Sequence, residues 1–152
     1  MPSELLLGPL QWMALLTYLG TCHFMERQAA VTAAAVFWGD SWLAPTLGRE
    51  YGRHHYQMPL ARRKTMEGSL VGVFLGTCVG SYILLTILGL DVPPLREMLV
   101  YGSLAAVAEG TAPGHWDNVA IAFILQACWD RVPMWLPSDE NMSVAVVPVI
   151  VS

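Results

Sequence analysis

Long apolar stretches separated by short polar connections dominate the hydropathy pattern of the chain. Residues Glu4 to Phe24 form a first apolar segment, and Gln28 to Gly48 form a second segment whose one formal charge is Asp40. The stretch from Gly68 to Leu90 carries no charge, and at about 1.5 Å rise per residue it is long enough to cross a bilayer. Each of these segments is therefore predicted to be a membrane-spanning helix.

Two shorter apolar segments follow. The first begins near Met98 and reaches Glu109 too soon to span a bilayer, so either Glu109 lies inside the membrane or this segment is re-entrant. Pro113-Gly114 breaks that segment, and Asp117-Asn118 opens the next apolar run, Val119–Trp129. The whole pattern predicts an all-α integral membrane protein with about five transmembrane or re-entrant helices.

Small residues recur within the third segment. Gly72, Gly76 and Gly80 stand at four-residue spacing, which places them on one face of a helix. Because small residues at this spacing let two helix backbones approach closely, this face is predicted to pack against another helix.

Composition agrees with the membrane class. The chain is 55% hydrophobic and 13% charged, with a mean hydropathy of +0.47. Cys22, Cys78 and Cys128 fall in apolar segments without C-x-x-C spacing, so we interpret them as buried hydrophobic residues. Acidic Glu4 precedes the first apolar run, which is atypical of a cleavable signal. We expect one membrane-embedded domain over residues 1–137 and a tail of unknown role over 138–152.

A basic loop from Arg49 to Glu67 separates the second and third segments. Pro45 and Gly48 loosen the preceding helix, and Gly52 and Pro59 disfavour a long helix within the loop. Five of the eight Lys and Arg residues of the chain lie in it: Arg49, Arg53, Arg62, Arg63 and Lys64. This excess of positive charge predicts that the loop faces the cytoplasm and meets an anionic ligand.

Several candidate functional groups are predicted to converge on that side. Counting spans puts Pro113 to Asp117 on the same face as the loop. Asp40 is a functional candidate because a carboxylate at mid-membrane depth costs about 2.5 to 3.5 kcal/mol on insertion scales, although a location at the interface is the alternative. Thr65 and Ser69 bracket the start of the third helix, whose free N–H groups favour phosphate.

This combination of groups is typical of phosphoryl or nucleotidyl transfer to a lipid. Arg, Lys and helix N–H groups hold phosphate oxygens, while Asp and Asn suit Mg²⁺. The sequence has neither a Walker glycine loop nor a kinase catalytic-loop motif. A solvated loop of a channel or scaffold is the alternative interpretation.

Ordered motifs over roughly residues 4 to 125 resemble the CTP-dependent lipid kinase family. The family includes dolichol, phytol and farnesol kinases and a diacylglycerol kinase, and is related to phosphatidate cytidylyltransferases. The motifs that carry the resemblance are Gly39-Asp40, Gly48-Arg49, Tyr51-Gly52-Arg53, Arg63-Lys64-Thr65, Gly68-Ser69, Glu109 and Asp117-Asn118, with an opening over Glu4-Leu5-Leu6 and Gly8-Pro9-Leu10 most similar to the phytol and farnesol kinase branch. The resemblance implies a membrane enzyme that uses CTP and a divalent ion to phosphorylate a long-chain isoprenoid alcohol.

Roles for individual residues follow from this interpretation. Residues expected to bind the nucleotide are Arg49, Arg53, Arg63, Lys64, Thr65 and Ser69. Asp117, Asn118 and Asp40 are expected to hold Mg²⁺, and Asp40, Lys64 and Glu109 are the expected catalytic residues. His54-His55 is interpreted as solvated loop, because adjacent side chains point apart.

Other activities stay open. A CTP-dependent diacylglycerol kinase and a phosphatidate cytidylyltransferase keep the nucleotide but change the acceptor or the product. The chain departs from the family pattern at two positions: it has Glu50 where the family commonly has Lys or Arg, and Ala122 where the family usually has Pro. A shortened non-catalytic relative that acts as a membrane scaffold is therefore another alternative. The expected partners are a nucleoside triphosphate and a lipid, not nucleic acid. The expected location is the endoplasmic reticulum or plastid membrane, or the cytoplasmic membrane in a bacterium.

Overall fold

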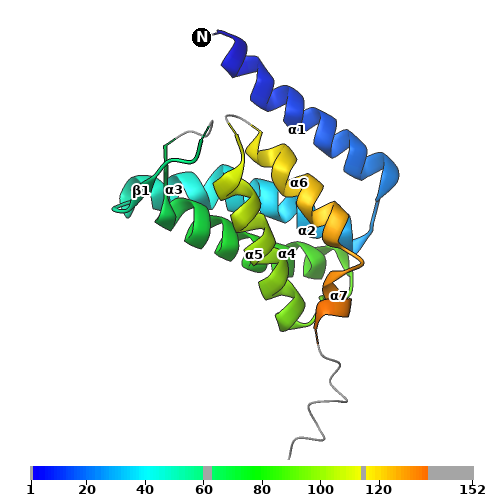
Figure 1. The fold of residues 1–152 in the computed structure, drawn as a ribbon. Helices are drawn as coiled ribbons and strands as arrows, with labels where there is room; N and C mark the ends of the chain where they lie inside the picture. The colour runs from blue at the N-terminus through cyan, green and yellow to red at the C-terminus, as the bar shows by residue number, and fades with distance from the viewer. Residues whose placement is uncertain (1, 60–62, 114–115, 137–152) are drawn as a thin grey trace, which may run out of the picture.

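The computed structural model describes residues 2–59, 63–113 and 116–136, and for residues 2–8 it describes the backbone alone. The predicted tail over 138–152, Arg62 and Gly114 lie outside the described residues. The described chain is mostly helical (Figure 1), which confirms the all-α prediction.

Every predicted apolar segment forms a helix, and the basic loop contains a small hairpin. The elements are α1 (Pro2–Cys22), α2 (Arg27–Ala34), the π-helix η1 (Ala35–Leu43), α3 (Ala44–Glu50), β1 (His55–Tyr56), β2 (Lys64–Thr65), the π-helix η2 (Glu67–Gly72), α4 (Val73–Leu88), α5 (Leu95–Thr111), α6 (Asp117–Cys128) and α7 (Val132–Trp135).

One predicted span has the properties of a membrane-crossing helix. Among the described residues, the continuous helix Glu67–Leu88 is the one that is long and apolar enough to cross a membrane. The prediction of about five helical segments therefore agrees with the structure, but the ability to span a membrane is supported for one of them. Helix α6 is apolar but has only 12 residues, and α5 has only 17.

Two long helical rods organise the fold. The first joins α2, η1 and α3, the second joins η2 and α4, and they run antiparallel, side by side (Figure 1). Helices α5 and α6 cross these rods, while α1 lies at the edge of the bundle. The centre of the core is filled by side chains at most 1% exposed, among them Val31, Val36, Val73, Tyr101 and Ile121.

The predicted glycine face makes the closest contact between the rods. A Cβ atom on Gly72 would lie 2.7 Å from the Cα of Ala44, and one on Gly76 would collide with the backbone of Gly39. The same face continues at Gly80, which packs against an indole ring. Since any side chain here would push the rods apart, the prediction of close helix packing is confirmed.

Gly76→Ala should therefore destabilise the protein by about 1 to 3 kcal/mol, the usual cost of overpacking a core. The matched control is Gly20→Ala in α1, where a new Cβ would have no atom within 4 Å. That control should stabilise slightly, because alanine favours a helix over glycine. Thermal unfolding in detergent measures both, and equal stabilities of the two variants would contradict the close packing.

The π-helical segments lie next to each other in the fold. η1 ends just before Pro45. Proline has no N–H to donate to the carbonyl one turn earlier, and its ring clashes with that turn of a regular α-helix. The helix is widened and not broken, so the predicted loosening takes the form of a π-helix that continues into α3. The segment η2 faces the same region from the second rod. Such π segments are frequent at functional sites.

The structure replaces part of the predicted loop with regular structure. Arg49 and Glu50 belong to α3, and β1 pairs antiparallel with β2, His55 opposite Thr65 and Tyr56 opposite Lys64. Strands of two residues are too short to produce the alternating pattern by which strands are predicted.

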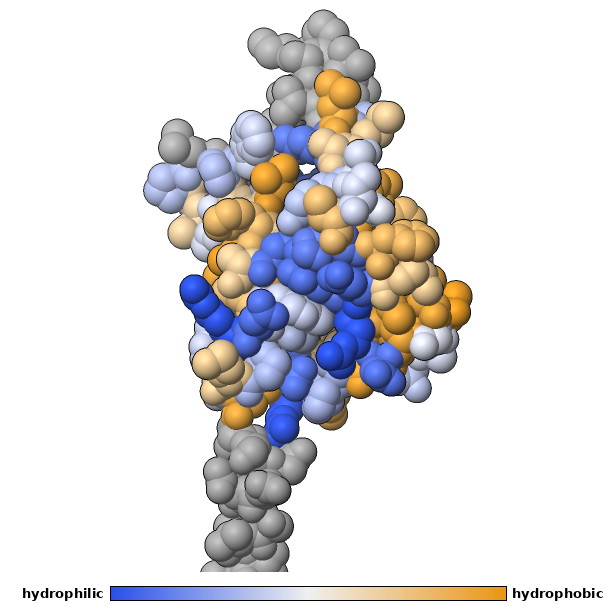
Figure 2. Space-filling model, turned by 90° about the vertical axis from the view of Figure 1, so that its right-hand side faces the viewer, coloured by the Kyte–Doolittle hydropathy of each residue, from blue (hydrophilic) through white to orange (hydrophobic). Residues whose placement is uncertain are grey.

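Polar and apolar surface are separated on the molecule. Large apolar side chains are exposed along the sides of the bundle, including Leu75, Val79, Tyr82, Val107 and Phe123. The end opposite the hairpin carries exposed charged residues in the helix connections: Glu26, Arg27, Asp91, Asp130 and Arg131. Figure 2 views this end and shows hydrophilic residues across its middle between hydrophobic surfaces.

Candidate functional site

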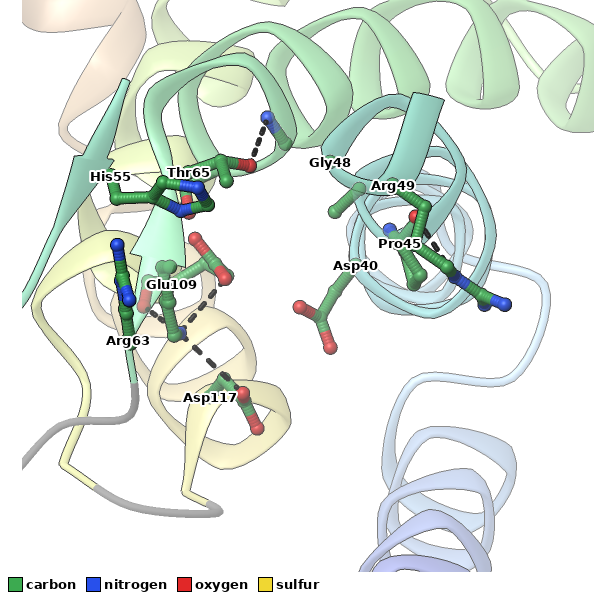
Figure 3. A pocket seen from close by; sticks show the side chains of 13 residues that line it. Asp40, Pro45, Gly48, Arg49, His55, Arg63, Thr65, Glu109 and Asp117 are labelled. Carbon is green, nitrogen blue, oxygen red and sulfur yellow. Dashed lines mark hydrogen bonds and ion pairs between the residues drawn. The ribbon is translucent and has the colours of Figure 1, made fainter. Parts of the chain in front are cut away.

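A cavity of about 550 Å³ opens where the two π segments, the hairpin and the ends of α5 and α6 meet (Figure 3). Helix ends and a hairpin bring together residues that are far apart in the sequence. The lining residues are Asp40, Ala44, Pro45, Gly48, Arg49, His55, Arg63, Lys64, Thr65, Gly68, Ser69, Glu109 and Asp117.

Three carboxylates gather in this cavity. Asp40 comes from η1, Glu109 from the last turns of α5, and Asp117 from the first residue of α6. One oxygen from each lies within 4.8 Å of the others. Glu109 is only 4% exposed, and its Oε2 is buried without a hydrogen-bond partner in the described part of the chain. Such a cluster of negative charge needs cations nearby to be stable.

Lys64 supplies one such cation. Its Nζ lies 2.8 Å from Oε1 of Glu109 and 3.5 Å from Oδ2 of Asp117, and it also donates to the Glu109 carbonyl at 2.6 Å. Burial is the largest influence on the pKa of Lys64 and lowers it, but the hydrogen bond to Glu109 and the charges of the three carboxylates together raise the pKa above its ordinary value. Lys64 is therefore an ammonium ion held against the cluster.

The start of the second rod forms one wall. The Thr65 hydroxyl accepts a hydrogen bond from the Gly68 N–H at 3.2 Å, and Ser69 is buried behind it. A Cβ atom on Gly68 would lie 2.8 Å from the carbonyl oxygen of Ala44, and one on Gly48 would lie 2.9 Å from the Thr65 hydroxyl. Gly68 has no room for a side chain because the rods meet there, and Gly48 leaves space for the Thr65 hydroxyl.

The hairpin fixes Lys64 in place. Next to Lys64 in the ladder, Tyr56 docks on the end of α5, where a Cβ on Gly110 would lie 2.9 Å from the Tyr56 hydroxyl. Burial raises the pKa of Tyr56, although its hydrogen bond with Ser69 opposes this, so the phenol stays protonated. No sequence pattern pointed to Tyr56, because its role depends on a strand pairing that the sequence did not predict.

The two adjacent histidines have different environments. His54 pairs with Glu67, 2.7 Å from Nδ1 to Oε1, outside the cavity. His55 lines the cavity, although its side chain was interpreted from the sequence as solvated loop. Both histidines are exposed, in agreement with the predicted solvated position, and His55 also borders the cavity.

The structure brings most, but not all, of the predicted nucleotide-binding residues to the cavity. Arg63 lines it from the hairpin. Arg49 also lines it, but its Nε donates to the Pro45 carbonyl at 3.3 Å, and Figure 3 shows the guanidinium turned away from the carboxylates. Arg53 is exposed in the connection between α3 and β1 and is not part of the lining, contrary to its predicted place in the site.

Asn118 is the second predicted site residue that the cavity lacks. Asp117 lines the cavity and Asn118 does not. Successive residues at a helix start project about 100° apart, so one of the pair faces away. The Asn118 Oδ1 atom is buried without a hydrogen-bond partner among the described residues. The third oxygen ligand beside Asp40 and Asp117 is offered by Glu109, which was predicted as a catalytic residue, and not by Asn118.

Comparisons with known proteins give a distant relationship. The chain is 26% identical over 153 residues to a protein of Zea mays named "Probable phytol kinase, chloroplastic", and the match covers 99% of this chain and 44% of the maize protein. The chain thus spans less than half the length of that protein. No family model matches the chain, and no solved structure does. The similarity indicates at most a phytol kinase-like relationship.

Proposed function

We propose that this chain carries the phosphoryl-transfer site of a membrane lipid kinase, which moves the γ-phosphate of CTP to an isoprenoid alcohol of the phytol, farnesol or dolichol type. The observation that carries the proposal is the cavity in which three carboxylates lie against Lys64, with Arg63 and a helix start beside them. The distant similarity to a protein named as a probable phytol kinase supports the same reaction class.

The carboxylate cluster fits a divalent ion. Asp40, Glu109 and Asp117 offer the oxygen ligands that Mg²⁺ prefers. The Oε2 of Glu109 is buried without a hydrogen-bond partner among the described residues, so it is free to bind the ion. These three residues would hold the ion, with Glu109 in place of the predicted Asn118. When bound, Mg²⁺ would offset the negative charge of the nucleotide phosphates.

Cationic and polar groups would hold the phosphates. Lys64 and Arg63 project from the hairpin side of the cavity, and Thr65 and Ser69 lie at the start of the second rod, whose N–H groups favour an anion. Arg49 would have to leave the Pro45 carbonyl to reach a phosphate.

Asp40 would act on the acceptor. It lies on the first rod, across the cavity from Glu109 (Figure 3), so a hydroxyl could enter between them. A carboxylate there can orient the alcohol and take its proton as the oxygen attacks the γ-phosphorus. The new P–O bond replaces the bond to the β-phosphate oxygen, and CDP leaves.

A membrane location is part of the proposal. The apolar sides and the polar end of the bundle are the surface pattern of a membrane-embedded domain, and the candidate span Glu67–Leu88 lies at its centre. The excess of basic residues in the loop supports a cytoplasmic hairpin.

We expect thiol labelling to place the two polar ends on opposite sides of the membrane. Gln57→Cys in the hairpin and Asp91→Cys between α4 and α5 would be made in a variant whose three cysteines are replaced by serine or alanine. A membrane-impermeant maleimide applied from the cytoplasm should modify the cysteine at position 57 and spare the one at 91. Labelling of both from the same side would contradict the topology.

Product analysis tests the reaction itself. Purified protein in phosphatidylcholine vesicles would be incubated with γ-labelled CTP or ATP, Mg²⁺ and phytol, farnesol, dolichol or diacylglycerol. We expect label on an isoprenoid alcohol and release of CDP. Release of pyrophosphate would identify a cytidylyltransferase, and label on diacylglycerol alone would identify a different acceptor. Absence of nucleotide binding would favour a non-catalytic scaffold.

A further inference from the structure

A second hollow lies on the first rod, away from the charged cavity. It is an apolar groove of about 530 Å³ between α1, the first rod and the end of α4. Its lining residues are Trp12, Leu16, Ala33, Ala34, Phe37, Trp38, Ser41 and Leu84. Ser41 is the one side chain among them that carries a hydroxyl, so the groove is suited to an apolar chain with a polar group at one end.

The groove and the carboxylate cavity are lined by residues of the same helical rod. Ala33, Phe37, Ser41 and Pro45 follow one another at four-residue spacing, which places them in a row. The first three line the groove, and Pro45 lines the cavity. Asp40, the neighbour of Ser41, already faces the cavity.

The size and lining of the groove favour one chain. Ligand sites are commonly about 300 to 1,000 Å³ and mostly apolar, and this groove falls within that range. Its walls are aromatic on two sides, with the rings of Trp12 and Phe37 in an edge-to-face contact at 5.8 Å. An isoprenoid alcohol has one hydrocarbon chain with a hydroxyl at its end, which matches an apolar lining that contains one hydroxyl group.

We propose that this groove binds the hydrocarbon chain of the isoprenoid alcohol and aligns the chain so that its hydroxyl passes Ser41 and reaches Asp40. The inference rests on the proposed kinase function and adds the location of the acceptor site. It also assigns a role to α1, which forms one wall of the groove through Trp12 and Leu16.

Photo-crosslinking tests the groove without any turnover. A farnesol analogue with a diazirine on its terminal isoprene unit would be added to the protein in phosphatidylcholine vesicles and activated, and the labelled peptides would be mapped. We expect label on residues 12–16 and 33–41 that unlabelled farnesol removes and dioleoylglycerol does not. Label spread over the exposed face of α4 at Leu75 and Val79, or equal competition by dioleoylglycerol, would overturn the proposal.

A matched pair of substitutions tests the same site. Ala33→Phe fills the groove from a half-buried position, whereas Ala14→Phe adds the same ring to an exposed position of α1 outside it. Ala33→Phe should reduce crosslinking and raise the KM for the alcohol by about tenfold or more, with the KM for CTP unchanged. Ala14→Phe should change neither value. An unchanged alcohol KM in Ala33→Phe would overturn the proposal.

The two proposals fail in different ways. Groove labelling without phosphorylation of any alcohol would overturn the kinase function and leave the groove as a binding site. Phosphorylation of the alcohol without groove labelling would overturn the acceptor site and leave the kinase function. If Ala33→Phe does not fold, the crosslinking map of the unaltered protein decides the location.

Discussion

Lys64→Met should unfold the protein more readily and abolish phosphoryl transfer. The ammonium of Lys64 is the cation that contacts both Glu109 and Asp117, and the side chains of Lys64 and Glu109 are 10% and 6% exposed. Removing one partner of such a buried pair leaves an uncompensated charge and costs about 3 to 5 kcal/mol. Thermal unfolding in detergent and CTP turnover measure the two effects.

A double variant separates stability from function. Lys64→Met with Glu109→Gln removes both charges of the pair, and replacing a buried pair is often close to neutral for stability. We expect the double variant to regain most of the lost stability and none of the activity, because phosphate contact and a metal ligand are both gone. Recovery of turnover in the double variant would contradict a role for Lys64 at the phosphates.

The exposed pair of His54 and Glu67 is the matched control. It has nearly the same separation as the Lys64 pair, 2.7 Å, but the His54 side chain is 79% exposed. Solvent screens such pairs, so His54→Met should change stability little and leave turnover intact. A large loss in this control would show that the effect at Lys64 does not come from burial.

The helices were predictable because their cause is local. Runs of apolar residues, Pro93-Pro94 and the glycine spacing fix where helices begin, end and touch, and all of these are present in the sequence. The hairpin was not predictable, since its strands are two residues long and are stabilised by docking Tyr56 on α5. The sequence predicted that the helix before Pro45 is loosened, but it did not predict that this stretch forms the π-helix η1.

The convergence of charged groups was predictable from topology, and their individual directions were not. Asp40, Glu109 and Asp117 were expected at one end of the bundle and lie within 4.8 Å there. Helix phase places Asp117 at the cavity and its neighbour Asn118 outside it, and Arg53 lies in the irregular connection between α3 and β1, outside the lining. The short motifs that contain these residues do not give the orientation of each side chain.

Asp117 is the residue whose role separates an enzyme from a scaffold. It is the first residue of α6, so its carboxylate could simply stabilise the helix start. Among the described residues, its Oδ1 accepts a local hydrogen bond from the N–H of Asn118 at 3.2 Å, and its Oδ2 lies 3.5 Å from the Lys64 ammonium. Asparagine can keep the local bond and is close to aspartate in size, but it is a much poorer ligand for Mg²⁺.

Asp117→Asn should therefore fold and insert normally and lose nearly all Mg²⁺-dependent phosphorylation. Replacing a residue that hydrogen-bonds to a metal ligand typically lowers metal affinity or activity by about 10- to 100-fold. Replacing a direct ligand should lower them at least as much. Mn²⁺ binding followed by electron paramagnetic resonance gives a readout independent of turnover. Asp130→Asn, an exposed acid at the opposite end of the bundle, should leave both measurements unchanged.

The two readouts together decide the assignment. Loss of Mn²⁺ binding and of turnover in Asp117→Asn, with unfolding unchanged, requires that the carboxylate act on a cation, because unchanged unfolding shows that the helix start is intact. Wild-type turnover with the same Mg²⁺ dependence would remove Asp117 from the metal site. The ion would then be held by Asp40, Glu109 and oxygens of the nucleotide phosphates. A variant that loses stability and activity in parallel would instead make Asp117 a structural partner of Lys64.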